Sequence, residues 1–360
     1  MTEASPLAGE QALATLLSDP QVEEVMINGP HKAFVIRGGR KIAKQLGFGD
    51  DDELRAVIGG MVRTAGRILD DTSPLVDVRL PDGSRLNVVI TPLAPATTVT
   101  IRRFVLRERT LDDLVQLGML SAGPSQFLKA AVQSGLNLLI CGGTSTGKTT
   151  LLNALCACIG PDERIVTIEE TRELALDHLL EDVCALEAHM MPGGKIITIR
   201  DLVKNAMRMR PNRIIVGEVR GPEALDVLTA MTSGHEGSMC TLHADNPREA
   251  LAKMHTYTLM TGEGMPSNAV LEMITRSVNL VIFCKRTREG EQRQVDTIFE
   301  VTGLQSDVIT GQEIFMRRDG ELVWTGVRPQ CEARLNGQGH DVSRVFRDTS
   351  SNPFERKSYW

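Results

Sequence analysis

The chain has 360 residues, of which 42% are hydrophobic and 24% are charged, the balance of an ordinary globular protein with room for two domains. Its formal net charge of −6 argues against a protein dedicated to nucleic acid, so we expect no direct nucleic-acid contact. The seven cysteines include no C-x-x-C pair, which excludes a zinc pattern or a disulfide framework and favours reduced thiols in a cytosolic protein.

No apolar stretch reaches the length of a membrane-spanning helix. The best candidate, Ala269–Cys284, is interrupted by Glu272, Arg276 and Asn279. The first ten residues are acidic and contain proline and glycine, so they do not resemble a signal peptide. We therefore expect a cytoplasmic protein whose association with a membrane is peripheral and occurs through partners.

The first part of the chain, residues 1–104, predicts a small α+β domain without a catalytic constellation of its own. Short apolar runs alternate with Gly- and Pro-containing turns, which is typical of strands in a meander. Three aspartates, Asp50–Asp52, suit the first turn of a helix. The expected elements are helices over Gln11–Leu17 and Asp50–Leu69, and strands over Val22–Asn28, Ala33–Arg37, Lys41–Phe48, Val76–Leu80, Ser84–Ile90 and Thr97–Phe104.

A polar stretch then predicts a linker over residues 105–111, followed by an α/β domain over residues 112–330. Helical and apolar strand segments alternate there, the signature of a mainly parallel sheet. Helices are expected over Leu111–Leu117, Ser125–Ser134, Thr149–Cys158 and Ile199–Met209, and strands over Leu136–Cys141, Arg164–Glu170, Arg213–Glu218, Met239–Ala244 and Asn279–Cys284. After Gly290 the chain reads as β structure, and residues 331–360 read as a polar, poorly ordered tail.

A phosphate-binding loop lies between the predicted strand Leu136–Cys141 and the helix that follows it. The loop matches G-x-x-x-x-G-K-[ST] in the strand–loop–helix context that the motif requires. Its backbone N–H groups suit phosphate, Lys148 suits the β- and γ-phosphates, and the Thr149 hydroxyl suits Mg²⁺. The sequence thus predicts ATP and Mg²⁺ as ligands of Gly142, Gly143, Thr144, Ser145, Thr146, Gly147, Lys148, Thr149 and Thr150.

Carboxylates and histidines follow the other predicted strands of this domain. Ligands of an open parallel sheet bind at the carboxyl ends of its strands, so these side chains should converge on the phosphate. We expect Glu169 and Glu218 to position water and metal, with Thr149, Glu169, Glu170 and Glu218 as the metal ligands. The alternative is that the glutamates are surface residues at strand ends.

Two histidines, His235 and His243, lie in a segment rich in glycine and serine. A lone histidine is more often structural than catalytic. The pair beside a strand end nevertheless favours a sensor of the γ-phosphate, with His243 as the catalytic member and His235 as a nucleotide contact.

Arginines supply the cations expected around a polyphosphate. Arg220, two residues after Glu218, is expected to act in catalysis, and the candidate nucleotide contacts are Arg85, Arg102 and Arg103 on strands of the first domain. We expect two or three arginines to contact nucleotide. Because adjacent strand residues face opposite ways, Arg102 and Arg103 cannot both reach one site without a bulge.

These motifs together resemble the secretion ATPases of type II, type IV pilus and type IV secretion systems. The resemblance is carried by Gly142–Thr149, Arg164–Leu174, Arg208–Asp226 and Ser233–Pro247, and by Val76–Asn87 and Val99–Phe104 in the first domain. It is strongest toward the branch that serves Flp/Tad pilus assembly. It implies a PAS-like N-terminal domain, a RecA-like P-loop ATPase domain and a homo-hexamer. It also implies inner-membrane pilus or secretion platform proteins as partners, at the inner face of the cytoplasmic membrane.

The chain departs from the family pattern at a few positions. Ser145 stands in the loop where glycine is usual, so a Cβ is expected to restrict the loop. Glu170 and Asn212 stand where aspartate is usual in the family, and Gly217 stands where many P-loop ATPases have an aspartate. Two alternatives to a pilus motor stay open: the same motor in DNA transfer or effector secretion, and a nucleotide-dependent switch with negligible turnover.

Overall fold

The computed structural model describes residues 8–103, 110–174, 176–190, 196–287 and 292–346. The chain divides into two units, Met1–Leu106 and Arg107–Trp360, and each is described by itself. The division falls within the segment in which the sequence predicts a linker, most of which lies outside the described residues. Leu111, where the predicted linker and the predicted helix Leu111–Leu117 overlap, begins a helix that Thr110 caps, as the helix prediction had it.

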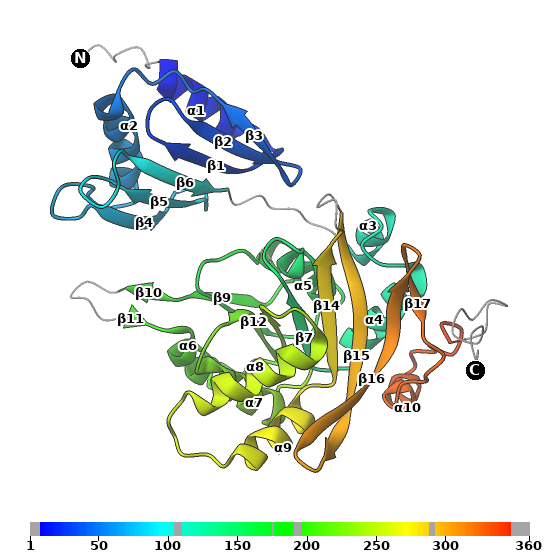
Figure 1. The fold of residues 1–360 in the computed structure, drawn as a ribbon. Helices are drawn as coiled ribbons and strands as arrows, with labels where there is room; N and C mark the ends of the chain where they lie inside the picture. Colours follow the sequence, from blue (N-terminus) through cyan, green and yellow to red (C-terminus); the bar gives the residue numbers. More distant parts are fainter. Residues whose placement is uncertain (1–7, 104–109, 175, 191–195, 288–291, 347–360) are drawn as a thin grey trace. The chain divides into compact units, whose positions relative to one another are not determined.

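The first unit is a six-stranded antiparallel sheet with two helices (Figure 1). Apolar residues at every second strand position pack against the helices, so the alternation seen in the sequence fixes the buried face. The strand order is β3-β2-β1-β6-β5-β4. The elements are α1 (Ala8–Ser18), β1 (Val22–Asn28), β2 (Ala33–Arg37), β3 (Arg40–Lys44), α2 (Asp51–Thr64), β4 (Leu75–Arg79), β5 (Arg85–Val89) and β6 (Thr98–Arg102).

The second unit is built on a nine-stranded mixed sheet of order β17-β16-β15-β14-β7-β13-β12-β8-β9. The strands from β14 to β9 are parallel, and β15–β17 add an antiparallel extension. The parallel strands are β7 (Leu138–Gly142), β8 (Ile165–Glu169), β9 (Val183–Glu187), β12 (Arg213–Val219), β13 (Met239–Leu242) and β14 (Leu280–Arg286). The others are β15 (Arg293–Gln305), β16 (Val308–Arg318) and β17 (Glu321–Trp324), with a separate pair β10 (His189–Met190) and β11 (Ile196–Ile197).

Helices cover both faces of this sheet, because most residues of the central strands are apolar and successive ones alternate between two cores. One core holds α3 (Leu111–Gln116), α4 (Ala122–Gln133) and α5 (Lys148–Cys156). The other holds α6 (Ile199–Ala206), α7 (Glu223–Thr232), α8 (Pro247–Leu259) and α9 (Ser267–Ser277). A single 3₁₀ turn, Leu176–His178, precedes β9. This arrangement confirms the predicted α/β fold class.

The segment after Pro329 corrects one expectation from the sequence. Residues 331–346 form a packed segment that includes α10 (Glu332–Gly337), and Leu335, Val342 and Phe346 are buried in the core. Phe346 lies 5.8 Å from Phe127 between ring centroids. The sequence did not predict this packing, because the few apolar residues of the segment are widely spaced among polar ones.

The apolar stretch Ala269–Cys284 is divided between α9 and β14. Within the described ranges, no helix combines the length and the apolarity needed to cross a membrane.

Candidate active site

The phosphate-binding loop connects β7, the middle strand of the nine-stranded sheet, to the first turn of α5. Gly142 has φ 153°, and a Cβ on it would lie 2.3 Å from the carbonyl oxygen of Cys284 on the neighbouring strand. Gly147 has φ 94° and precedes Lys148 as the N-cap of α5. Both glycines are therefore required by the backbone, one for close approach and one for its left-handed conformation.

Ser145 adopts φ 59°, the left-handed conformation that glycine adopts at little cost. The expected restriction therefore takes the form of strain, because a side chain in this region costs about 1–2 kcal/mol. Thr146 stabilises the loop locally by donating from Oγ1 to the carbonyl of Gly143 at 2.9 Å.

Ser145→Gly is expected to be more stable than Ser145→Ala by about 1 kcal/mol, because only glycine relieves the left-handed strain. Alanine is the matched control, since it removes the hydroxyl but keeps the Cβ. Chemical denaturation of both variants measures the difference. Equal stability would show that the loop holds this conformation without strain.

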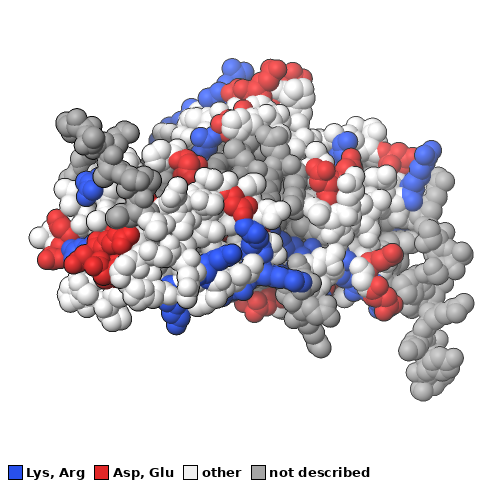
Figure 2. Space-filling view, turned by 90° about the horizontal axis from the view of Figure 1, so that it is seen from above, with Lys and Arg blue, Asp and Glu red and all other residues white. Residues whose placement is uncertain are grey.

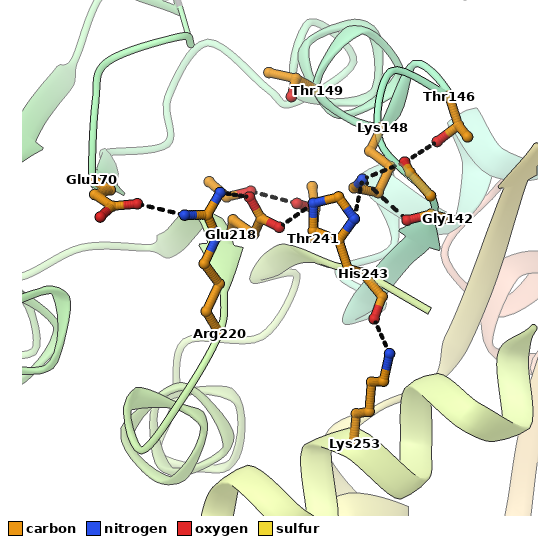
Figure 3. Close-up of polar contacts among 12 residues, drawn as sticks. Gly142, Thr146, Lys148, Thr149, Glu170, Glu218, Arg220, Thr241, His243 and Lys253 are labelled. Atoms are coloured by element: carbon orange, nitrogen blue, oxygen red, sulfur yellow. Dashed lines mark hydrogen bonds and ion pairs between the residues drawn. The ribbon is translucent and has the colours of Figure 1, made fainter. Parts of the chain in front are cut away.

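Lys148 is buried, and its ammonium contacts the loop that surrounds it (Figure 3). Nζ donates to the carbonyl oxygens of Gly142 at 3.1 Å and Gly143 at 2.8 Å, and lies 3.5 Å from Nδ1 of His243. Burial lowers the pKa of Lys148 from its ordinary value, and the nearby Glu218 carboxylate opposes that shift. The loop thus holds a cation at the carboxyl end of β7, where phosphate is expected.

His243 joins Lys148 to Glu218. Because the Lys148 ammonium can only donate, Nδ1 of His243 accepts, and Nε2 lies 2.7 Å from Glu218 Oε1. Burial and then the Lys148 charge lower the pKa of His243, which favours the neutral form. The ring is thus oriented by contacts on both nitrogens.

Arg220 and Lys253 support this chain of contacts (Figure 3). Arg220 donates to Glu218 Oε2 at 2.7 Å through Nη2 and to Glu170 Oε2 at 2.7 Å through Nη1. Lys253, from α8, donates to the carbonyl oxygen of His243 at 3.0 Å. The structure therefore brings together four residues of the predicted site, Lys148, His243, Glu218 and Arg220, and attaches Glu170 to them through Arg220.

Glu169 has a different role from the catalytic and metal-binding role expected from the sequence. Its side chain is buried, and Oε1 accepts from the backbone N–H groups of Glu173 at 2.9 Å and Leu174 at 3.0 Å. A Cβ on Gly217 would lie 2.8 Å from Glu169 Cγ, so the glycine in the usual aspartate position makes room for this side chain. The assignment of Glu169 is corrected: it holds the segment after β8 in place.

Burial raises the pKa of Glu169 to about 8, with the two backbone N–H groups opposing the shift. The folded protein then binds a proton that the unfolded chain releases above about pH 4.5, so stability should fall as pH rises through the window up to about pH 8. Glu169→Gln keeps the accepting oxygen and is expected to flatten that fall. Urea unfolding at several pH values measures it, and an unchanged slope would show that Glu169 does not titrate there.

Glu173 is a candidate that sequence reasoning missed. Thr149 Oγ1 donates to Glu173 Oε2 at 3.2 Å, so this carboxylate faces the hydroxyl expected to bind Mg²⁺. Among the described residues, no group of three or more His, Cys, Asp or Glu side chains could hold a metal by itself. One hydroxyl and one carboxylate fit Mg²⁺, which proteins commonly bind together with substrate phosphates. The signal was the position of Glu173 just beyond a strand end.

His235 does not join the site within the chain. Its Nδ1 lies 3.0 Å from the carbonyl oxygen of Pro211, which precedes β12, and its own carbonyl accepts from Ser238, which precedes β13. Both neighbours lie at the amino ends of the parallel strands, whereas Lys148 lies at the carboxyl ends. The prediction that His235 contacts nucleotide is corrected for this reason.

The arginines of the first unit divide into two kinds. Arg103 donates through Nη1 to the carbonyl oxygens of Asp19 and Val22, so it holds the turn before β1, which corrects its assignment as a nucleotide contact. Arg85 is directly opposite Arg102 on the neighbouring strand and forms an ion pair with Asp77 at 2.7 Å. Arg102 is also directly opposite Glu24 on β1, so an acidic residue accompanies each arginine, and the contact of Arg85 and Arg102 with phosphate stays a prediction.

Comparison with known proteins places these motifs in one family. The family described as "Type II/IV secretion system protein" matches residues 7–317. A Mycobacterium tuberculosis protein whose name assigns it provisionally to conjugal transfer is 36% identical over 296 residues, 80% of this chain and 83% of its own. VirB11 of Agrobacterium fabrum is 31% identical over 296 residues, 74% of this chain and 85% of its own.

A solved structure, the ATPase DotB of Legionella pneumophila, has the same fold. It is 19% identical with a TM-score of 0.57, over 84% of this chain and 83% of its own. The chain thus has the RecA-like P-loop fold with an N-terminal domain. From its phosphate-binding loop, the residues around Lys148 and the extent of the family match, we conclude that the chain belongs to the type II/IV secretion system protein family.

Proposed function

We propose that this protein hydrolyses ATP with Mg²⁺, as a motor of a secretion machine. The observation that carries the proposal is the chain of contacts from Lys148 through His243 to Glu218 at the carboxyl edge of the sheet. It combines a cation for phosphate, a group that senses it and a carboxylate for water. Relatives of the same family include ATPases such as DotB, which supports ATP as substrate.

The residues have separable tasks in this reaction. The loop N–H groups and Lys148 bind the β- and γ-phosphates, and a phosphate that reaches Lys148 replaces its contacts with Gly142 and Gly143. His243 then meets the γ-phosphate, because it contacts the same ammonium. Glu218, held by His243 and Arg220, orients the attacking water and accepts its proton.

Thr149 would hold Mg²⁺ together with the phosphates, with Glu173 or Glu218 contributing directly or through water. The ion would neutralise the charge that develops on the phosphate oxygens during transfer. This assignment replaces Glu169 by Glu173 in the predicted ligand set.

We infer further that the motor acts as a homo-hexamer on inner-membrane platform proteins, from the cytoplasmic side. The relatives named for conjugal transfer and VirB11 support a type IV secretion or DNA-transfer system. The stretches GGT-GKTTLLNAL and GEVRG-EALD support Flp/Tad pilus assembly as the second candidate. Neighbouring genes for a prepilin would favour the second, and mating-pair genes the first.

Nucleic acid is not proposed as a direct ligand. The formal net charge is −6, and the face drawn in Figure 2 carries acidic groups at its sides and rim as well as the basic side chains gathered across its middle. An extended basic surface is the electrostatic footprint of nucleic-acid binding. These observations favour a nucleotide over a polynucleotide.

Steady-state phosphate release from ATP, with Mg²⁺ and then with EDTA, tests the proposal. Turnover that requires Mg²⁺ is expected. Nucleotide binding without turnover, in the presence of Mg²⁺ and across protein concentrations that allow assembly, would favour the switch over the motor.

The first domain is expected to complete the site. Changing Arg85 and Arg102 together to alanine should remove most turnover and leave the circular dichroism spectrum unchanged, because transition-state charge requires cations from outside the loop. Lys41→Ala with Lys44→Ala is the matched control, since it removes two exposed cations from edge strand β3 of the same sheet. Full activity of the arginine double variant would place the required cations elsewhere.

A further inference from the structure

The β14–β15 hairpin brings two arginines together beside the phosphate-binding loop. Arg286 at the end of β14 is directly opposite Arg293 at the start of β15. The pairing places both arginines at one end of these two strands, so the pair is a candidate for contacts with phosphate. Cys284, two residues before Arg286, is paired with Gly142, so the two arginines lie at the same edge of the sheet as the loop.

Arg293 contacts the loop itself. A Cβ on Gly147 would lie 3.4 Å from Arg293 Cδ and 3.2 Å from Met119 Cε, so both side chains pack on the glycine that caps α5. The segment that carries Met119 is fixed to β15, because Val295 N donates to the Met119 carbonyl at 2.8 Å and Gln292 Nε2 to that of Leu117 at 3.2 Å. The side chains of Arg293 and Met119 thus line one side of the N-cap of α5, and hydrogen bonds connect the two segments that carry them.

The order of strands decides which end of a nucleotide these two side chains meet. The groups proposed for the γ-phosphate and metal lie on or just after β13, β12 and β8, which lie on one side of β7. Strands β14 and β15 lie on the other side (Figure 1). A nucleotide whose terminal phosphates bind at Lys148 and point toward Glu218 must extend its nucleoside half toward β14 and β15.

We propose that Arg293 contacts the α-phosphate and ribose of the bound nucleotide, with Met119 as the apolar surface beside it. The proposal rests on the proposed function, since it assumes nucleotide at the loop. It assigns Arg293 to the nucleoside and α-phosphate, which ATP and ADP share, whereas His243 is assigned to the terminal phosphate of ATP. The guanidinium is suited to this task because it presents several donors to phosphate and ribose oxygens.

Isothermal titration of the full chain with ADP and with AMPPNP tests this division. Arg293→Ala is expected to weaken both ligands about tenfold, the size of one lost charge-assisted hydrogen bond. His243→Ala is expected to weaken AMPPNP more than ADP. Arg293→Lys keeps the positive charge and a long aliphatic chain, so it should recover part of the affinity. It therefore separates the loss of a phosphate contact from a loss of packing.

Arg276→Ala is the matched control, because it removes an exposed arginine from α9, before the amino end of β14. Unchanged affinity of Arg293→Ala for both ligands would overturn the inference and leave the proposed function intact. A loss confined to AMPPNP would also overturn it, by placing Arg293 at the terminal phosphate. A wild-type chain that binds neither ligand would overturn the proposed function as well.

Discussion

Replacing Lys148 with alanine is expected to abolish ATP turnover and to weaken nucleotide binding severely. Lys148 is the buried cation of the loop, held between Gly142 O, Gly143 O and His243. The β- and γ-phosphates carry concentrated negative charge, and an ammonium at their bridge stabilises both the bound state and the transfer. Its loss also leaves His243 without the donor that orients Nδ1.

Phosphate release and calorimetric titration with ADP measure the two effects. Lys148→Met is a second variant that keeps the buried aliphatic volume, so a defect shared by both variants reports the charge. Lys129→Ala, on the exposed surface of α4, controls for the removal of one lysine. A wild-type rate in the alanine variant would refute the assignment of the loop as the catalytic phosphate site.

Replacing Glu218 with glutamine is expected to slow turnover at least about a hundredfold while ATP still binds, because the amide keeps the shape but cannot accept a proton from water. In the structure both carboxylate oxygens are held, Oε1 by His243 and Oε2 by Arg220. Such fixed partners leave the carboxylate one orientation, which suits a residue that must hold water in line with a phosphate.

Single-turnover phosphate release, started with bound ATP, separates the chemical step from binding. Glu236→Gln is the matched control, because that carboxylate pairs with Arg334 away from the loop. If Glu218→Gln kept the wild-type rate and the wild-type Mg²⁺ dependence, the water-positioning role would move to Glu173, the other carboxylate that lies next to the loop residues.

Local patterns account for the parts of the fold that were predicted well. Val22–Asn28 and Ala33–Arg37 are strands with the predicted bounds, because alternating side chains and flanking turn residues act within a few positions. The strand–loop–helix around Lys148 was predicted for the same reason. The helix from Asp50 instead ends at Thr64, and α7, α8 and α9 were not predicted at all.

Helices α7–α9 pack against the sheet and against one another, so their apolar residues face several directions. Periodicity is a weak signal in such segments, because a helix buried on more than one side has no single polar face. The tail shows the same limit, since the core that buries Phe346 is assembled from residues of α4 and β16 far away in the sequence.

The sequence by itself determined the motif and the fold class, and it pointed to four residues that the structure brings together and that stay the proposed site: Lys148, His243, Glu218 and Arg220. These follow from chemistry that is local to one loop or one strand end. The sequence could not show which carboxylate at or after the end of β8 faces Thr149. Glu169 and Glu173 are four residues apart, and only the packing of Glu169 beside Gly217 turns the first inward and leaves the second at Thr149.

Tertiary structure also decided between the two histidines. The nine residues from His235 to His243 include β13, which advances about 3.3 Å per residue, so the two histidines lie at opposite ends of the parallel strands. Likewise, Arg293 comes to the loop only because β14 pairs with β7 and carries β15 beside it. Residue type is written in the sequence, but which groups meet depends on strand order and register, which are set by contacts between distant segments.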